Sequence, residues 1–139
     1  MNALCKLASQ YGPLAGRILL ALIFVMAGWN KIGGFEQTAG YMASKGLPMA
    51  NILLTLTIII ELGAGLMVLL GMYARWGAAA LFGFTLLATL IFHNFWAIAD
   101  AQQAYIQSLM FMKNLAIMGG LLYVVAYGSG AFSIKKENC

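Results

Sequence analysis

Apolar residues gather in four long runs along this chain, and short polar stretches separate the runs. The runs lie at about residues 14–32, 48–71, 76–98 and 105–127. A helix needs roughly 20 consecutive, mostly apolar residues to cross the hydrocarbon core of a bilayer. Each run is about this long. The pattern therefore predicts an all-α protein, an integral membrane four-helix bundle that forms a single domain over residues 1–139.

The longest polar connection, residues 33–47, leaves two interpretations open. Its apolar residues Phe35, Ala39 and Met42 recur at roughly helical spacing, which is typical of a short amphipathic helix lying on the membrane surface. Such a helix could cover a cavity that opens on this side. The alternative is a plain connector. The first run is expected to begin at its introducing Pro13, because proline is tolerated at a helix start.

Composition supports a membrane environment. The 139 residues are 63% hydrophobic and only 9% charged, whereas soluble domains carry roughly 25% charged residues. The net charge of +4 includes no basic cluster interleaved with aromatic residues, so nucleic-acid binding is not expected. The connections on one side carry Lys6, Arg75, Lys135 and Lys136. The positive-inside rule therefore predicts that both termini are cytoplasmic.

Cysteine and histidine are too few to indicate redox or metal chemistry within the chain. Cys5 and Cys139 lie at opposite ends, no Cys-x-x-Cys motif occurs, and His93 is the single histidine. We therefore expect two reduced thiols and predict no metal or haem site. The sequence also has no flavin or cluster motif.

Three ionic residues lie well inside the apolar runs: Arg17, Glu61 and Lys113. Lys31 lies at the very end of the first run, where its side chain is expected to reach the headgroups. A charge at the centre of a membrane helix costs at least about 2.5–3.5 kcal/mol, so such residues are expected to pair or to line a polar cavity. Helical rise places Glu61 near mid-membrane, with Arg17 below it and Lys113 above it. We expect an intramembrane ion-pair network in which Arg17 is the direct partner of Glu61. Its role is either to fix helix register or to line a functional cavity.

A second polar group is expected in the outer half of the bilayer, next to aromatic residues. A planar, lipid-soluble headgroup needs such surroundings, and histidine can donate to a quinone carbonyl or accept a proton from a quinol. Spacing alone does not distinguish a quinone from a lipid headgroup or a trapped water molecule. The candidate ligand-binding residues are Asn30, His93, Asn94, Trp96, Lys113 and Asn114.

The chain resembles the DoxX family of small bacterial membrane proteins over residues 16 to about 128. The matching segments are GRILLALIF at 16–24, AGWNKIG at 27–33, ELGAGLMVLLG at 61–71, FHNFW at 92–96 and FMKNLAIMGGLL at 111–122. The resemblance implies a multi-pass protein of the bacterial inner membrane. It also implies that the recurring polar positions of the family correspond here to Arg17, Lys31, Glu61, His93, Lys113 and Asn114.

Members of this family are linked to membrane oxidoreductases, including a subunit of an archaeal thiosulfate:quinone oxidoreductase, and to oxidative-stress complexes with soluble partners. The resemblance therefore implies an oxidoreductase subunit with a quinone as ligand and a soluble or membrane-bound partner. No complete redox centre is expected in the chain, so an enzymatic activity of its own stays open. Two alternatives are a small-molecule or ion carrier that works as a homo-oligomer, and a structural scaffold for a soluble partner.

Overall fold

The computed structural model describes residues 2–137, and over this range its regular structure is helical apart from one isolated bridge. Its elements are α1 (Ala3–Gly33), α2 (Phe35–Ser44), α3 (Ala50–Ile59), the π-helical turn η1 (Ile60–Ala64), α4 (Gly65–Leu70), α5 (Ala74–Phe92), the 3-10 turn η2 (Phe95–Ala97) and α6 (Ala101–Tyr127). The elements α3, η1 and α4 follow one another without a break. Four helical segments are therefore long and apolar enough to cross a membrane, as predicted. The expected thiol Cys139 lies outside the described residues.

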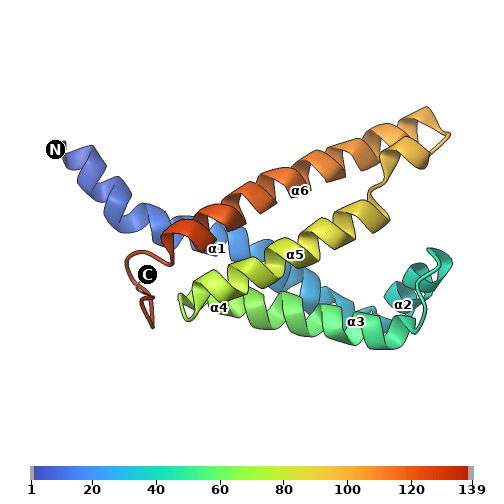
Figure 1. The fold of residues 1–139 in the computed structure, drawn as a ribbon, viewed down its shortest axis with the longest axis horizontal. Helices are drawn as coiled ribbons and strands as arrows, with labels where there is room; N and C mark the ends of the chain where they lie inside the picture. The colour runs from blue at the N-terminus through green and yellow to red at the C-terminus, as the bar shows by residue number, and fades with distance from the viewer. Residues whose placement is uncertain (1, 138–139) are drawn as a thin grey trace.

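Three helix ends differ from the predicted spans by four residues or more, and one of them is the start of α6, at Ala101 rather than at residue 105. The first helix begins at Ala3 rather than at residue 14, and it passes through Pro13. Proline removes one helical hydrogen bond, but the residues around it favour helix strongly enough to continue. Figure 1 shows the first turns of α1 projecting beyond the bundle. Helix α5 ends at Phe92 rather than at residue 98, because His93 and Asn94 leave the helical backbone conformation.

The long polar connection contains helix α2, so the amphipathic-helix interpretation is correct and the plain connector is wrong. Its apolar residues Ala39 and Met42 are buried and pack with Leu54 of α3. Most of its other residues are exposed. In Figure 1, α2 lies at the end of the bundle opposite both termini. It directly follows α1 and packs against the last residue of α5 through the stacked rings of Tyr41 and Phe92.

Glycines bring the helices close together at three contacts. A Cβ atom added at Gly28 of α1 would lie 2.8 Å from the Leu62 side chain, and one at Gly65 of α4 would lie 3.1 Å from Val25. At Gly77 of α5 the atoms nearest to an added Cβ are the backbone oxygen of Ala64 in η1 and the side chain of Met67 in α4. Helices in lipid gain little from apolar burial against one another, so close packing at small residues specifies their arrangement.

We expect Gly77→Ala to lower the free energy of unfolding by about 1–3 kcal/mol, as overpacking does. Its Cβ would lie 2.9 Å from both the carbonyl oxygen of Ala64 and the Cβ of Met67. The matched control is Gly83→Ala in the same helix, where nothing lies within 4 Å. Equilibrium unfolding in mixed micelles measures both variants. Equal stability of the two would contradict the tight α4–α5 contact.

The residues after α6 form an ordered segment, residues 128–137, which we call the C-terminal clasp. The amide of Ile134 donates to the carbonyl of Leu70 at 3.1 Å, and the amide of Lys135 donates to the carbonyl of Gly71 at 3.1 Å. The clasp therefore pairs with the end of α4 in the manner of a short strand.

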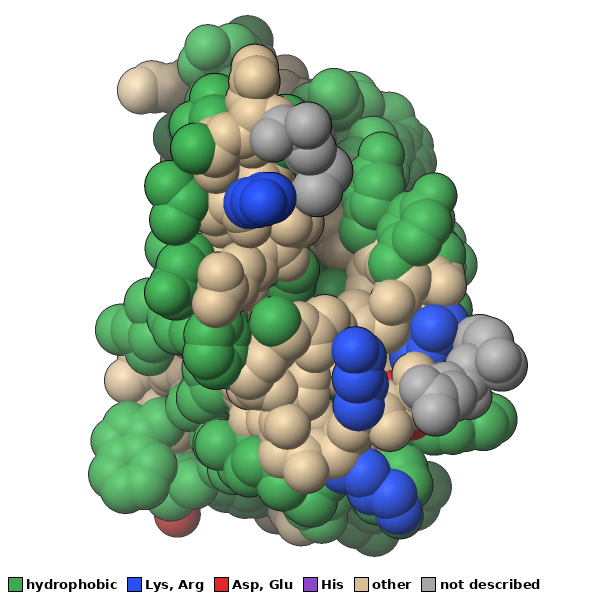
Figure 2. All heavy atoms as spheres, turned by 90° about the vertical axis from the view of Figure 1, so that its left-hand side faces the viewer, with side chains coloured by type: hydrophobic (Ala, Val, Ile, Leu, Met, Phe, Trp, Pro, Cys, Tyr) green, Lys and Arg blue, Asp and Glu red, His purple; other side chains and the backbone are tan. Residues whose placement is uncertain are grey.

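Figure 2 looks onto the end of the bundle that carries both termini, and several Lys and Arg side chains are visible there. Lys6, Lys135 and Lys136 are exposed, and Arg75 is half-buried. Both termini and the α4–α5 turn lie at this end. The basic end is the one that the positive-inside rule would place in the cytoplasm, and this orientation stays a prediction.

Candidate functional site

A polar pocket of about 360 Å³ lies among the spanning helices and α2. Side chains from α1, α2, α3, η1, α5 and α6 line it, together with His93 just after α5. Aromatic and aliphatic side chains supply much of its wall. The polar side chains that face it are Lys31, Thr38, Tyr41, Thr57, Glu61, Thr85, His93, Gln107, Lys113 and Asn114.

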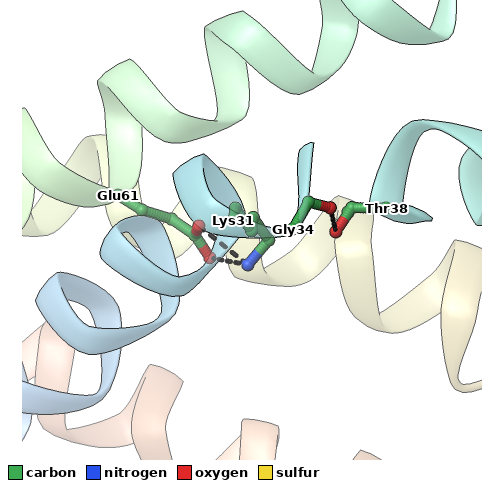
Figure 3. Close-up of polar contacts among 4 residues, drawn as sticks. All are labelled: Lys31, Gly34, Thr38 and Glu61. Carbon is green, nitrogen blue, oxygen red and sulfur yellow. Dashed lines mark hydrogen bonds and ion pairs between the residues drawn. The ribbon is translucent and has the colours of Figure 1, made fainter. Parts of the chain in front are cut away.

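An ion pair between Lys31 and Glu61 forms one side of the pocket. The Nζ atom of Lys31 lies 3.0 Å from Oε1 and 2.9 Å from Oε2 of Glu61, as Figure 3 shows. The Glu61 side chain is 5% exposed and that of Lys31 is 26% exposed. The carboxylate is therefore almost enclosed, while the ammonium group borders the pocket. Two charges inside membrane-spanning helices are neutralised by each other, which is the arrangement expected of intramembrane charges.

Local backbone structure brings these two residues together. Gly28 lets α1 approach η1 so closely that an added Cβ would lie 3.2 Å from the Cβ of Glu61. Lys31 follows Gly28 by three residues, so both lie on the same face of α1. Glu61 itself belongs to the π-helical turn η1. Such turns shift the face of a helix by one residue and often occur at functional sites.

A hydrogen bond joins His93 to Gln107 on the side of the pocket formed by α5 and α6. The Nδ1 atom of His93 lies 2.7 Å from Oε1 of Gln107. With this oxygen as acceptor, Nδ1 carries the proton and Nε2 keeps a free lone pair. His93 can take this position because α5 ends one residue earlier. The early end of α5 therefore presents an acid–base side chain to the pocket.

Asn114 is linked to α5 by a short chain of hydrogen bonds. Its Nδ2 atom donates to Oγ1 of Thr89 at 2.8 Å, and that hydroxyl donates to the carbonyl of Thr85 at 2.6 Å. The Thr85 side chain lines the pocket, is 4% exposed as a residue, and its Oγ1 has no hydrogen-bond partner among the described residues. A buried hydroxyl normally has a partner. Its position favours a polar ligand or water in the pocket.

Lys113 lines the pocket with no anionic partner. Within residues 2–137, no carboxylate oxygen lies within 4.0 Å of its Nζ atom. Its nearest polar contact is the sulfur of Met110 at 3.6 Å. A charge of this kind in a spanning helix is a functional-site candidate. Lys113 can therefore donate to a ligand that enters from the lipid side.

Comparison with known proteins decides the family of this chain. The DoxX family model matches residues 12–94, which is more than half of its length. The chain belongs to the DoxX family. The matched range includes Lys31, Glu61 and His93, whereas Lys113 and Asn114 follow it.

Two relatives of this DoxX protein match over almost their whole length. The chain is 41% identical to inner membrane protein YqjF of Escherichia coli over 131 residues, covering 94% of this chain and 95% of the relative. It is 33% identical to inner membrane protein YphA of the same organism, covering 89% and 88%. These relatives and the four spanning helices make the chain a multi-pass protein of the bacterial inner membrane.

A more distant relative is larger. The chain is 30% identical to a Surfeit locus protein 4 homolog of Schizosaccharomyces pombe, over 91% of this chain but 37% of the relative. No solved structure matches the chain. The names of these relatives give a membrane location for two of them and no reaction for any of the three.

The structure of this DoxX protein brings together three of the six candidate ligand-binding residues. His93, Lys113 and Asn114 line the pocket, as their positions in the outer halves of two neighbouring helices suggested. Their role in binding stays a prediction. The other three, Asn30, Asn94 and Trp96, are not among the residues that line it. Trp96 is 61% exposed and packs edge-on against Phe95 and Phe111 instead.

The expected direct pairing of Arg17 with Glu61 is wrong, and the two residues are not linked through Lys113. Glu61 pairs with Lys31. The Nη2 atom of Arg17 donates to the carbonyls of Ala131 and Phe132 in the C-terminal clasp, at 3.3 and 3.0 Å. The physical reason is that backbone carbonyls of the clasp lie beside Arg17 at its own depth. An extended side chain that reached mid-membrane would lose them.

Six of the ten polar side chains that face the pocket were not candidate site residues from the sequence, and Lys31, Gln107 and Thr85 are three of them. Lys31 was expected at the headgroups. Its position one helical turn after Gly28, where a close helix contact is possible, was the feature that could have indicated an inward orientation. Gln107 gave no signal, because a glutamine near a helix start is usually solvated. Thr85 lies within an apolar run, where threonine commonly bonds to its own helix backbone.

Proposed function

We propose that this DoxX protein is a membrane subunit that binds the headgroup of a quinone or quinol in the polar pocket. We further propose that it serves a partner oxidoreductase, in the membrane or bound to it, that exchanges the electrons. The observation that carries the proposal is a pocket among the apolar, membrane-spanning helices that combines a histidine, a carboxylate and an ammonium with no anionic partner within residues 2–137. A pocket of this size is within the range of small-molecule sites.

The residues present fit the two forms of such a ligand. Carbonyl oxygens of a quinone need donors, which Lys113 and the second amide hydrogen of Asn114 can supply. Hydroxyl groups of a quinol need acceptors, which Glu61 and Nε2 of His93 can supply. The unpartnered hydroxyl of Thr85 can serve either form. A bound quinone supplies reversible electron transfer coupled to protons.

His93 is the side chain best suited to take up a proton in the pocket. Gln107 fixes its ring through Nδ1, so Nε2 is the atom left to accept. Histidine can change charge near neutral pH, which carboxylates and lysines ordinarily do not. The neighbouring Lys31–Glu61 pair is electrically neutral as a unit. It therefore shapes the pocket without adding net charge beside the imidazole.

Removing Lys113 is expected to weaken quinone binding by at least about tenfold, because a hydrogen bond to a charged group contributes about 1.5–3 kcal/mol. Removing His93, whose Nε2 atom is an acceptor, is expected to weaken quinol binding by about two- to tenfold, because a neutral hydrogen bond contributes about 0.5–1.5 kcal/mol. The variants are Lys113→Ala, titrated with a quinone, and His93→Ala, titrated with the corresponding quinol, each reconstituted in lipid nanodiscs. The retained ligand is measured by absorbance after the discs are purified. Lys6→Ala is the matched control, since Lys6 is exposed and far from the pocket in sequence. Wild-type affinity in both pocket variants would refute the site.

One observation favours the structural-scaffold alternative. The pairs Lys31–Glu61, His93–Gln107 and Asn114–Thr89 each connect two different helical segments or their ends, so they also specify the packing. A purely structural role predicts lower unfolding free energy in variants of these residues and no effect on ligand retention. Lys113 distinguishes ligand binding from a structural role, because among the described residues it makes no hydrogen bond or ion pair to another helix. Its substitution should change binding and leave stability nearly unchanged.

A further inference from the structure

A second, larger hollow lies between α1 and α6, with a volume of about 830 Å³. Its wall is mostly apolar, apart from Lys113 at the end shared with the polar pocket and Arg17 and Ser129 toward the other end, and small residues keep it open. Gly16 has nothing within 4 Å of an added Cβ, and Ala116 is exposed on the facing helix. The two helices are in contact at Gly120, whose added Cβ would lie 3.3 Å from the side chain of Leu20. We call this hollow the α1–α6 cleft.

The cleft and the polar pocket share part of their walls. Ile23 of α1, and Lys113 and Ile117 of α6, line both. A molecule that occupies the polar pocket can therefore continue into the cleft past Lys113. From residue 23 to residue 13 the cleft follows α1 for about 15 Å, given the helical rise. Pro13 and residues 128–130 of the C-terminal clasp close its far end.

The polar pocket is followed by a long, mostly apolar cleft. An amphiphile with a polar headgroup and one long apolar chain has the matching arrangement. We propose that the α1–α6 cleft holds the apolar tail of the ligand whose headgroup occupies the polar pocket, so that the ligand is a long-chain isoprenoid quinone. The inference rests on the proposed function, which names the headgroup. Bilayer lipid is as apolar as the cleft, so the tail gains orientation there rather than hydrophobic free energy.

Filling the cleft tests the inference. We compare a benzoquinone that carries a long isoprenoid chain with the same headgroup that carries a methyl group instead, each titrated into nanodiscs. Ala116→Phe is expected to weaken binding of the long-chain quinone by at least about fivefold, the lower end of the effect of overpacking. Binding of the short-chain quinone should not change. Ala80→Phe is the matched control, because Ala80 is exposed on α5 and lines neither hollow.

Gly16→Leu fills the cleft from α1 and provides a second variant should Ala116→Phe fail to fold. The inference is overturned if filling the cleft changes the two affinities equally or changes neither. It is also overturned if mass spectrometry finds a phospholipid retained by the wild type and lost from the filled variants. Wild-type protein that binds neither quinone would refute the proposed function and the inference together. If the wild type binds both quinones and filling the cleft changes neither affinity, the inference alone would be refuted.

Discussion

Replacing Lys31 by methionine is expected to lower the free energy of unfolding by about 3–5 kcal/mol, because it leaves a buried carboxylate without its partner. The Glu61 side chain is 5% exposed, and Lys31 supplies the single cation within 4.0 Å of it in residues 2–137. Glu61→Gln should be milder, at about 1–3 kcal/mol. The freed ammonium of Lys31 lies near the end of α1, from which a long side chain can turn toward the headgroups.

The double variant Lys31→Met/Glu61→Met distinguishes the stability that comes from the ion pair from the cost of burying a charge without a partner. Replacing both members of a buried ion pair by apolar residues is often neutral or stabilising, so most of the lost stability should return. Reversible unfolding in mixed micelles gives the four free energies of the cycle formed by the wild type, Lys31→Met, Glu61→Met and the double variant. We expect a coupling free energy of at least about 2 kcal/mol. Additive effects of the two single variants would contradict the ion pair.

Gly71→Ala is expected to destabilise the basic end of the bundle by about 2–5 kcal/mol. Its backbone has φ of 66°, a left-handed conformation that costs about 1–2 kcal/mol with a side chain. Its added Cβ would also lie 1.8 Å from Nη1 of Arg17 and 2.7 Å from the Cβ of Ser133. Arg17 would have to move, and overpacking of this kind adds about 1–3 kcal/mol.

Gly46→Ala is the matched control for that experiment. Gly46 has φ of 82° but nothing within 4 Å of an added Cβ, so it carries the backbone strain without the clash. The difference between the two variants, measured by the same unfolding titration, isolates the contact with Arg17. If both variants lose the same stability, the described packing around Arg17 is incorrect.

Run length and hydropathy were sufficient to predict the four spanning helices, because each buries its backbone polar groups within itself. The ends of the helices were harder to predict. Pro13 lies inside α1 rather than before it, because proline removes one hydrogen bond while the flanking turns still form. The end of α5 at Phe92 accompanies the hydrogen bond between His93 and Gln107, a residue 14 positions further along the chain, which a local pattern does not contain.

Partners of the intramembrane charges depend on helix rotation as well as depth. Depth alone allowed Arg17 to reach Glu61, and it placed Lys31 at the headgroups. The close contact at Gly28 turns Lys31 toward Glu61 instead. The acceptors of Arg17 are backbone carbonyls, which every residue has, so no side-chain pattern could have identified them.

The C-terminal clasp has a consequence for how the protein is made. The ribosome synthesises Ala131 and Phe132 only after all four spanning helices, yet Arg17 in the first helix depends on their carbonyls. Until then the nascent first helix carries a cation that lacks these acceptors. The hydrogen bonds of Arg17 therefore form late in biogenesis, after residues 131 and 132 have been translated.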